Sequence, residues 1–283
     1  MYYIQESDKP ILVAKIFNIV EIVDDKIIIP ISENEIIDNK KAFILAKKIK
    51  KILDKTSCKS IILSKYLKKQ ESFVSVLNNY SIEIIDGKWL FAVLSSKVLD
   101  YIVLKENIKK EETNVSVLIN NNDSDYIIEN IKNIIRTYKS VNIVTTNMGK
   151  FRKLEKDILE KQGAMITITN NKKKSLMRSR IILNIDFTTE EINKYNIPEE
   201  ALIVNLIGNV EINKKRFNGL NINDYEISFE NFEEFDYDKS KLYSQKDIYE
   251  SLIYKKQPYE YIEKKINRDK VKIIELIGKR TSF

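Results

Sequence analysis

Histidine is missing from this chain of 283 residues, and cysteine occurs once, as Cys58. Without histidine, the chain lacks the side chain that most often acts as a general base near neutral pH and most often binds transition metals. This excludes histidine-dependent catalytic triads, histidine-bearing zinc sites and the HExxH motif. A single cysteine excludes an intrachain disulfide. Because no cluster of carboxylates stands out either, we predict no metal site.

Long apolar runs are also missing, since none reaches the roughly 18 residues that a membrane-spanning helix needs. The first ten residues, MYYIQESDKP, show no basic segment followed by an apolar one, as a secretory signal would. Hydrophobic residues nevertheless make up 43% of the chain, which is enough to build a core. We therefore expect a cytoplasmic protein with no membrane span.

Basic residues exceed acidic ones, and the formal net charge is +7. Such an excess favours acidic partners such as nucleic acid, nucleotides or anionic lipid. It also has a compositional explanation, because the chain is rich in Ile, Lys, Asn and Tyr and holds only 6 Gly and 4 Pro, a bias that an AT-rich genome produces. Charge alone therefore leaves the partners unknown, with nucleic acid, a protein partner or self-association as alternatives.

The first part of the chain mixes strand and helix patterns. Two β-branched runs, Ile11–Val23 and Lys26–Ile31, flank an Asp-Asp pair and predict a β-hairpin. Apolar residues at helical spacing predict helices over Asn39–Leu53 and Lys88–Leu104. We therefore expect an N-terminal α/β domain over residues 1–108.

After this domain, strands and helices alternate regularly. Apolar runs predict strands over Val115–Ile119, Val141–Thr145, Ala164–Ile168, Ile181–Ile185 and Ala201–Leu206. Amphipathic segments between the first three strands predict helices over Ser124–Tyr138 and Gly149–Gln162. Alternation at this spacing builds a parallel sheet with right-handed crossovers. The predicted fold class is α/β, with two α/β domains, the second a Rossmann-like parallel sheet with flanking helices over residues 109–212. Residues 213–283 are expected to form a C-terminal segment that packs back on the domains.

A resemblance to known families lies in VSVLINNNDSDYIIENIKNIIRTYKSVNIVTTNMGKFRKLEKDILEKQG, which runs into RSRIILNID. This stretch resembles the nucleotide-binding domain of shikimate dehydrogenases and glutamyl-tRNA reductases. In those families a strand leads into a glycine-rich turn and a helix, and the second strand ends in an Asn-Arg pair. The resemblance implies a Rossmann-type fold. Before Glu106 no segment matches the motifs that carry the catalytic Lys and Asp of shikimate dehydrogenases, so the catalytic residues stay unknown.

The glycine-rich turn of the resemblance falls on a loop without glycine. Its candidate cofactor-binding residues are Asn120, Asn121, Asn122 and Ser124. Glycines let the backbone approach a pyrophosphate, and their loss hinders that approach. Asn tolerates left-handed backbone conformations, so the turn itself is expected to survive. Asp123 and Asp125 place negative charge where an anion would bind, and they are well suited to cap the following helix.

The end of the second strand offers further candidates. Asn147 matches the family's Asn, while Met148 stands in place of the Arg. Lys150 and Arg152 follow, and basic residues at this point are what the 2′-phosphate of NADP needs. The alternative is that they form the solvated face of an amphipathic helix. No cofactor is the leading expectation, and NADP is the expectation if one binds.

The densest group of basic residues lies after the third predicted strand. It consists of Lys172, Lys173, Lys174, Arg178 and Arg180. A nucleotide or RNA phosphate could bind there, although no stacking aromatics or reading element accompany the charges. A solvated loop is the alternative.

Three hypotheses about function follow. The first is a Rossmann-like binding or scaffold protein with lost or altered dinucleotide use. The second is an NADP-dependent oxidoreductase with a divergent phosphate loop. The third is an RNA- or nucleotide-binding protein that uses the basic patch.

Overall fold

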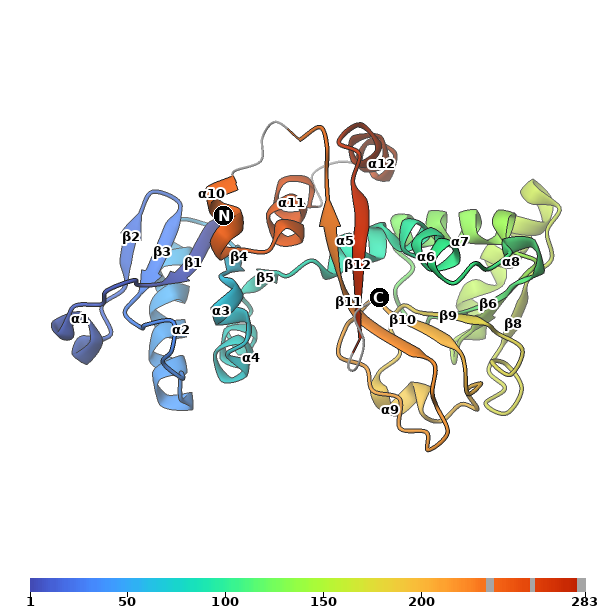
Figure 1. The fold of residues 1–283 in the computed structure, drawn as a ribbon, viewed down its shortest axis with the longest axis horizontal. Helices are drawn as coiled ribbons and strands as arrows, with labels where there is room; N and C mark the ends of the chain where they lie inside the picture. Colours follow the sequence, from blue (N-terminus) through green and yellow to red (C-terminus); the bar gives the residue numbers. More distant parts are fainter. Residues whose placement is uncertain (233–236, 255–257, 279–283) are drawn as a thin grey trace. The chain divides into compact units, whose positions relative to one another are not determined.

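The computed structural model describes residues 1–232, 237–254 and 258–278. The chain divides into two compact units, and each has its own sheet (Figure 1). Unit 1 comprises Met1–Gly87 and Phe232–Lys256, and unit 2 comprises Lys88–Asn231 and Gln257–Phe283. Both sheets are mostly parallel and flanked by helices, so the predicted α/β fold class with two α/β domains is confirmed.

The division between the units differs from the predicted boundary at residues 108 and 109. Helix α5 (Lys88–Val93) and helix α6 (Ser95–Lys105) belong to unit 2, although they were expected as one helix of the first domain. Both pack on α7 (Asp125–Thr137), and α6 also contacts β12 (Lys272–Gly278). Their apolar faces are therefore buried in unit 2.

Unit 1 is built on a five-stranded sheet with the order β2-β3-β1-β4-β5. The strands in chain order are β1 (Tyr2–Glu6), β2 (Glu21–Val23), β3 (Lys26–Ile29), β4 (Ser60–Leu63) and β5 (Glu83–Ile85). β2 runs antiparallel to β3, and all the other neighbours are parallel. β2 is therefore an edge strand, and β1 lies in the middle of the sheet.

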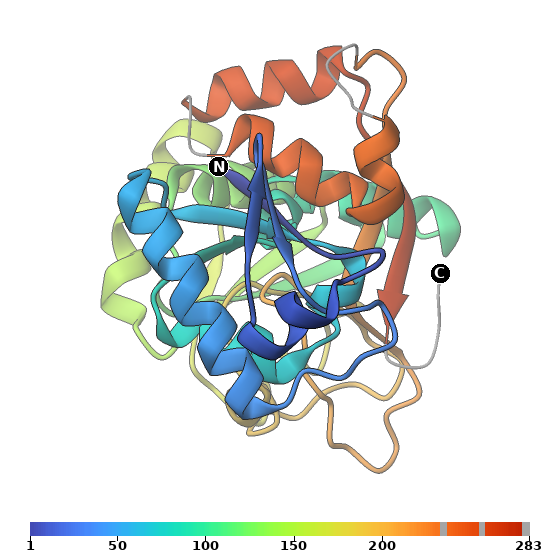
Figure 2. The same cartoon turned by 90° about the vertical axis from the view of Figure 1, so that its left-hand side faces the viewer.

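The helices of unit 1 surround its sheet. They are α1 (Leu12–Phe17), α2 (Asn39–Lys55), α3 (Lys65–Lys68), α4 (Glu71–Asn79), α10 (Tyr237–Leu242) and α11 (Gln245–Ile253). Those that bury apolar side chains complete its core, whereas α1 buries none. Figure 2 shows α2, in light blue, crossing the sheet. α2 and α4 contact each other, and buried side chains of both, such as Leu45 and Phe73, pack with Ile4 and Ile61 of the sheet. Burial of these apolar surfaces stabilises unit 1.

The segment predicted as the first strand of the hairpin contains a short helix and only a short strand. Leu12–Phe17 forms α1, which ends at Asn18 with φ 49°, in the left-handed region. The hairpin is formed by β2 and β3, and the turn between them contains Asp24 with φ 54°. The Asp-Asp pair thus marks the turn as predicted, but the strand before it spans only Glu21–Val23.

Unit 2 is built on a seven-stranded sheet with the order β12-β11-β10-β9-β6-β7-β8. The strands besides β12 are β6 (Asn114–Leu118), β7 (Ser140–Val144), β8 (Thr167–Thr169), β9 (Ile181–Asn184), β10 (Leu202–Asn205) and β11 (Leu220–Ser228). All neighbours are parallel except β12, which runs antiparallel to β11. Counted from β6, the parallel strands have the order 3-2-1-4-5-6, which defines a Rossmann-like sheet.

Helices lie on both faces of this sheet (Figure 1). They are, besides α5 to α7, the 3-10 helix η1 (Lys110–Glu112), α8 (Met148–Gln162), α9 (Thr189–Ile192) and α12 (Tyr259–Arg268). α8 ends at Gly163 with φ 63°, the predicted left-handed cap. On the face of α9, Phe187 and Ile192 pack with Leu118 and Ile203. Within the described ranges no helix is long and apolar enough to cross a membrane.

Candidate functional site

In the unit 2 sheet the order of the strands reverses direction between β6 and β9, and the carboxyl ends of these two strands lie at the same edge. The chain proceeds from β6 to β7 and β8 on one side, and from β9 to β10 and β11 on the other. Loops that follow β6 and β9 therefore diverge at this point, and α/β sheets bind their ligands in the resulting crevice. The predicted phosphate loop, which follows β6, lies at this position.

A carboxylate of the chain itself binds the backbone of that loop. The two oxygens of Asp186, which comes just after β9, accept hydrogen bonds from the backbone N–H groups of Asn120 (2.7 Å), Asn121 (2.6 Å) and Asn122 (2.9 Å). In Rossmann folds, backbone N–H groups at this turn bind the pyrophosphate of the dinucleotide. As arranged here, these three groups are already bonded to the carboxylate of Asp186.

Asn120 is held by its side chain as well as by its backbone. Its Oδ1 accepts hydrogen bonds from the backbone N–H and from Oγ1 of Thr146, both at 2.8 Å, and its Nδ2 donates to Glu191 at 3.2 Å. None of Asn120, Asn121 and Asn122 has a positive φ. The loop therefore makes its turn without using the left-handed conformation that Asn tolerates. Asn120 instead joins the ends of β6 and β7 through its amide.

Neither Asp123 nor Asp125, both expected to cap the helix, is the N-cap of α7. Asp123 forms an ion pair with Lys150 at 3.0 Å, and the hydrogen bond from Lys150 lowers the pKa of the Asp123 carboxyl. The N-cap of α7 is Ser124, whose hydroxyl donates to Oδ1 of Asn122 at 2.7 Å. Asp125 lies in the first turn of α7, where its charge complements the helix dipole.

Lys150 and Arg152, the basic residues predicted to favour NADP, have separate surroundings. Nζ of Lys150 also donates to the backbone oxygen of Asn121 at 2.7 Å, so this lysine joins α8 to the loop. Arg152 lies on the exposed side of α8. Asn147 is the N-cap of α8, and its backbone N–H donates to Oγ1 of Thr145 at 3.0 Å. The structure thus joins Lys150 to the loop and leaves Arg152 facing solvent.

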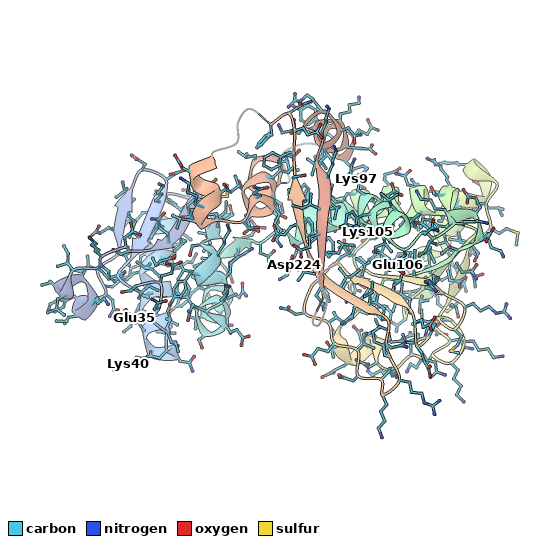
Figure 3. All side chains as sticks on the ribbon, viewed as in Figure 1. Glu35, Lys40, Lys97, Lys105, Glu106 and Asp224 are labelled. Atoms are coloured by element: carbon cyan, nitrogen blue, oxygen red, sulfur yellow. The ribbon has the colours of Figure 1, made fainter. Side chains whose placement is uncertain are left out.

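The predicted basic patch is split between two edges of the sheet. Lys172, Lys173 and Lys174 follow the carboxyl end of β8 and are exposed. Arg178 and Arg180 lie at the opposite edge. Their backbone groups bond to Asn114, the first residue of β6, at 3.1 Å each. Arg180 also pairs at 3.7 Å with Glu106, which is labelled in Figure 3. The five residues are therefore spread along the loop that connects the carboxyl end of β8 to the amino end of β9.

Buried amides fill the carboxyl ends of the neighbouring strands. Asn184 on β9 and Asn205 on β10 have no solvent exposure. Nδ2 of Asn205 donates to Oδ1 of Asn221 at 2.8 Å and of Asn223 at 3.1 Å, both on β11. Sequence reasoning missed this network and Asp186. The sequence did contain a signal for both, because a polar residue stands at or just after the end of each apolar strand: Asn184 and Asp186 for β9, and Asn205 for β10.

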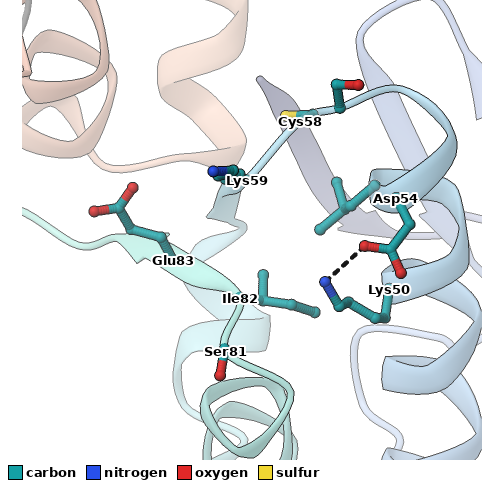
Figure 4. Close-up of a pocket in the computed structure, with 9 residues that line it drawn as sticks. Lys50, Asp54, Cys58, Lys59, Ser81, Ile82 and Glu83 are labelled. Atoms are coloured by element: carbon teal, nitrogen blue, oxygen red, sulfur yellow. Dashed lines mark hydrogen bonds and ion pairs between the residues drawn. The ribbon is translucent and has the colours of Figure 1, made fainter.

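A cavity of about 500 Å³ lies in unit 1 (Figure 4). Its lining includes Lys50, Asp54, Cys58, Lys59 and Glu83, and Lys50 pairs with Asp54 at 2.6 Å. The cavity lies at the amino ends of β4 and β5, opposite the edge at which parallel sheets bind ligands. Across the part of the chain that the structure describes, no three Cys, Asp or Glu side chains are grouped so that they could hold a metal ion.

No protein-family model matches the sequence, and no curated protein matches it either. Among solved structures, L-tryptophan dehydrogenase from Nostoc punctiforme has a TM-score of 0.31 and 8% identity, over 67% of this chain and 53% of that chain. Aspartate transcarbamoylase from Trypanosoma cruzi, in complex with N-(phosphonacetyl)-L-aspartic acid, has a TM-score of 0.27 and 10% identity, over 58% of each chain. The chain spans about half the length of the dehydrogenase. The likeness is distant and extends to the Rossmann-like α/β arrangement alone.

Proposed function

We propose that unit 2 is a Rossmann-like binding or scaffold unit in which Asp186 takes the place of a dinucleotide's phosphates. The observation that carries the proposal is the set of three hydrogen bonds from Asn120, Asn121 and Asn122 to the Asp186 carboxylate. Bonds from N–H groups to an ionised acceptor are among the stronger hydrogen bonds in proteins. A diphosphate would have to break all three before it could use the same donors.

The charges around the loop support the same conclusion. Asp123 and Asp186 lie against the loop and would repel a phosphate. Lys150, the basic residue that contacts the loop, is engaged by Asp123 and by the backbone oxygen of Asn121. The loop thus keeps an excess of negative charge, and its arrangement favours a role in binding partners or in supporting the fold over hydride transfer.

The direct test is a calorimetric titration of the dialysed full-length protein with NADPH and with NADH. We expect no heat of binding for either dinucleotide. Micromolar binding of NADPH or NADH would contradict the proposal, because the loop would then accept a diphosphate despite Asp186.

A pair of variants tests the role of Asp186 itself. Asp186→Ala removes the internal acceptor, and Asp123→Ala removes a carboxylate from the same loop but leaves the three hydrogen bonds in place. We expect Asp186→Ala to bind inorganic pyrophosphate at least about tenfold more tightly than the wild type, and more tightly than Asp123→Ala. Equal gains in the two variants would show that net charge, rather than the freed backbone donors, governs the site.

The NADP-dependent oxidoreductase is the competing hypothesis, and the 3-2-1-4-5-6 strand order is the observation in its favour. If NADPH binds, Lys150→Ala and Arg152→Ala should weaken its binding much more than that of NADH. Equal loss for both dinucleotides would argue against recognition of the 2′-phosphate by these residues.

The nucleic-acid hypothesis depends on Lys172, Lys173 and Lys174, which are exposed at the carboxyl edge of the sheet. It predicts retention on a heparin column that falls steeply with salt and falls further when the three lysines are changed to glutamine. A triple change of Lys47, Lys51 and Lys55 on α2 is the matched control for loss of charge elsewhere in the chain. Equal effects of the two triple changes would show that retention follows net charge.

A further inference from the structure

A cavity of about 180 Å³ lies in unit 2, lined by residues of α5, α6, α7 and α12 and by Leu94 between α5 and α6. Part of its lining is an apolar wall formed by Val93, Leu94 and Ile266, all of them almost fully buried. Pockets for drug-sized ligands are usually about 300–1,000 Å³. This cavity therefore suits a smaller molecule, and its lining includes no residue of the loop that binds Asp186.

A buried amide holds one side of the cavity together. Asn130 of α7 has an exposed fraction of 2% and lines the cavity. Its Oδ1 accepts a hydrogen bond from Oγ of Ser96 on α6 at 2.6 Å. Its Nδ2 donates to the backbone oxygens of Val93 on α5 at 3.2 Å and of Tyr126 on α7 at 2.8 Å. Three helices are thus joined around one amide, and such a preformed wall lowers the cost of ordering a site when a ligand binds.

Two side chains of opposite charge line the cavity from different helices. Lys97 of α6, labelled in Figure 3, is half-buried, and Glu263 of α12 is exposed at the rim. Within the described ranges neither forms an ion pair, with the other or with any third residue. On neighbouring α7 the charges do pair, since Lys132 lies 2.6 Å from Glu129. Lys97 and Glu263 therefore leave one positive and one negative charge at the cavity for a bound molecule to complement.

The pKa of Tyr259 indicates a negative potential near Glu263. Tyr259, the first residue of α12, also lines the cavity. Burial raises its pKa to about 12, the charges of Glu263 and Glu129 act in the same direction, and a hydrogen bond with Asn130 opposes them. The hydroxyl is therefore protonated at neutral pH, and a potential that disfavours a phenolate favours a cation. This end of the cavity suits an ammonium group.

The arrangement of charges and apolar surface defines the chemistry of the ligand. An α-amino acid carries a carboxylate for Lys97 and an ammonium group for Glu263, and its ammonium can also donate to the hydroxyl of Tyr259. An apolar side chain would pack on the apolar wall. A monoamine leaves Lys97 without a counter-charge, and a monocarboxylate leaves Glu263 without one.

We propose that this cavity is a binding site for a small α-amino acid with an apolar side chain. Lys97 binds its carboxylate, and Glu263 binds its ammonium group. The inference does not depend on the function proposed for the loop at Asp186, because no residue of that loop lines the cavity.

The test is calorimetric titration of the full-length protein with L-leucine, for which we expect a dissociation constant below about 1 mM. Two compounds of the same carbon skeleton each lack one charge. 3-Methylbutylamine has no carboxylate, and 4-methylpentanoate has no ammonium group. Each should bind at least about tenfold more weakly than L-leucine, because each loses one charge-assisted contact. No binding of L-leucine, or equal binding of the three compounds, would overturn the proposal.

Variants assign each charge to one end of the ligand. Lys97→Gln should weaken L-leucine about tenfold and leave 3-methylbutylamine unchanged, since that compound has no carboxylate to lose a partner. Glu263→Gln should weaken L-leucine similarly and leave 4-methylpentanoate unchanged. In each case the unchanged compound shows that the variant is folded. Lys153→Gln, on the exposed side of α8, is the control for loss of a surface charge and should bind L-leucine as the wild type does. Wild-type affinity for L-leucine in both Lys97→Gln and Glu263→Gln would refute the assignment.

Discussion

Asn184 donates a hydrogen bond of 2.9 Å from its Nδ2 to Oδ1 of Asn205, and this bond joins β9 to β10 in the interior of unit 2. The same Nδ2 donates to the backbone oxygen of Phe187, and Oδ1 of Asn184 accepts from the backbone N–H of Phe187, both at 2.9 Å. One buried amide thus fixes the chain just beyond β9, the segment that contains Asp186.

Asn184→Ala should lower the free energy of unfolding by about 2–3 kcal/mol, because it leaves buried partners on Phe187 and Asn205 without their hydrogen bonds. Urea unfolding measures the change. Asn196→Ala is the control, since the Asn196 side chain is exposed and makes a 3.4 Å contact with the backbone oxygen of Lys173. A loss for Asn184→Ala no larger than for Asn196→Ala would contradict the importance of the buried network.

Gly219 tolerates no side chain, because a Cβ there would lie 2.1 Å from the backbone oxygen of Ala201. Gly219→Ala should therefore force β10 and β11 apart and cost at least about 2 kcal/mol. Gly149, in the first turn of α8, has nothing within 4 Å of the same position. Gly149→Ala should stabilise the protein by about 0.5–1 kcal/mol, through its helix propensity. Thermal unfolding of the two variants should give shifts of opposite sign, and shifts of the same sign would refute the steric argument.

The buried carboxyl of Asp247 in unit 1 should make stability depend on pH. Burial raises its pKa from 3.8 to about 6, and the ion pair with Lys68 at 2.6 Å opposes this shift. Between these two pKa values the folded protein keeps a proton that the unfolded chain has released. Asp247 therefore favours folding at the acid end of this range, and its contribution is lost as the pH rises through about 6.

Asp247→Asn removes this titration. The free energy of unfolding of the wild type minus that of Asp247→Asn should fall by about 3 kcal/mol between pH 4 and pH 7. Urea unfolding at both pH values measures it, and Asp54→Asn, at an exposed ion pair with Lys50, should show no comparable change. A difference that grows with pH would mean that Lys68 outweighs burial.

The hydrogen bonds to Asp186 should also be visible without any ligand. In the wild type, the amide protons of Asn120, Asn121 and Asn122 should exchange slowly with solvent, because each is bonded to the carboxylate. In Asp186→Ala they should exchange faster, and the free energy of unfolding should fall by about 1–3 kcal/mol. Amide hydrogen exchange followed by mass spectrometry tests this. Unchanged protection in Asp186→Ala would indicate another acceptor for the loop.

The regular part of unit 2 could be predicted because its patterns are local. On α7 the predicted apolar stripe is buried, including Ile127, Ile131 and Ile134. Gly163 ends α8 as expected from its freedom to adopt positive φ. In unit 1, β1 was missed, because its partners Ile27 and Ile61 lie far away in the sequence and no turn signal connects them.

The residues of the candidate site were predicted better than their roles. Asn120 and Lys150 do lie together at the carboxyl edge, as strand order requires. The contact of Asp186 with the loop could not be predicted, because Asp186 is 64 residues from Asn122 in the sequence. The two meet only because β9 pairs with β6. The placement of the basic residues could not be predicted for the same reason, since the loop that contains them crosses from one edge of the sheet to the other.

Asp186 belongs to the chain, so the anion that fills the loop cannot be diluted away. A tethered group acts at an effective concentration that reaches the millimolar range or more. A phosphate compound in solution therefore has to outcompete a neighbour that is always present, whatever the metabolic state of the cell. Under the proposed function, the conformation of the loop is set once, when the strands assemble, and does not follow the supply of nucleotides. The unit would then provide a constant shape to whatever binds it.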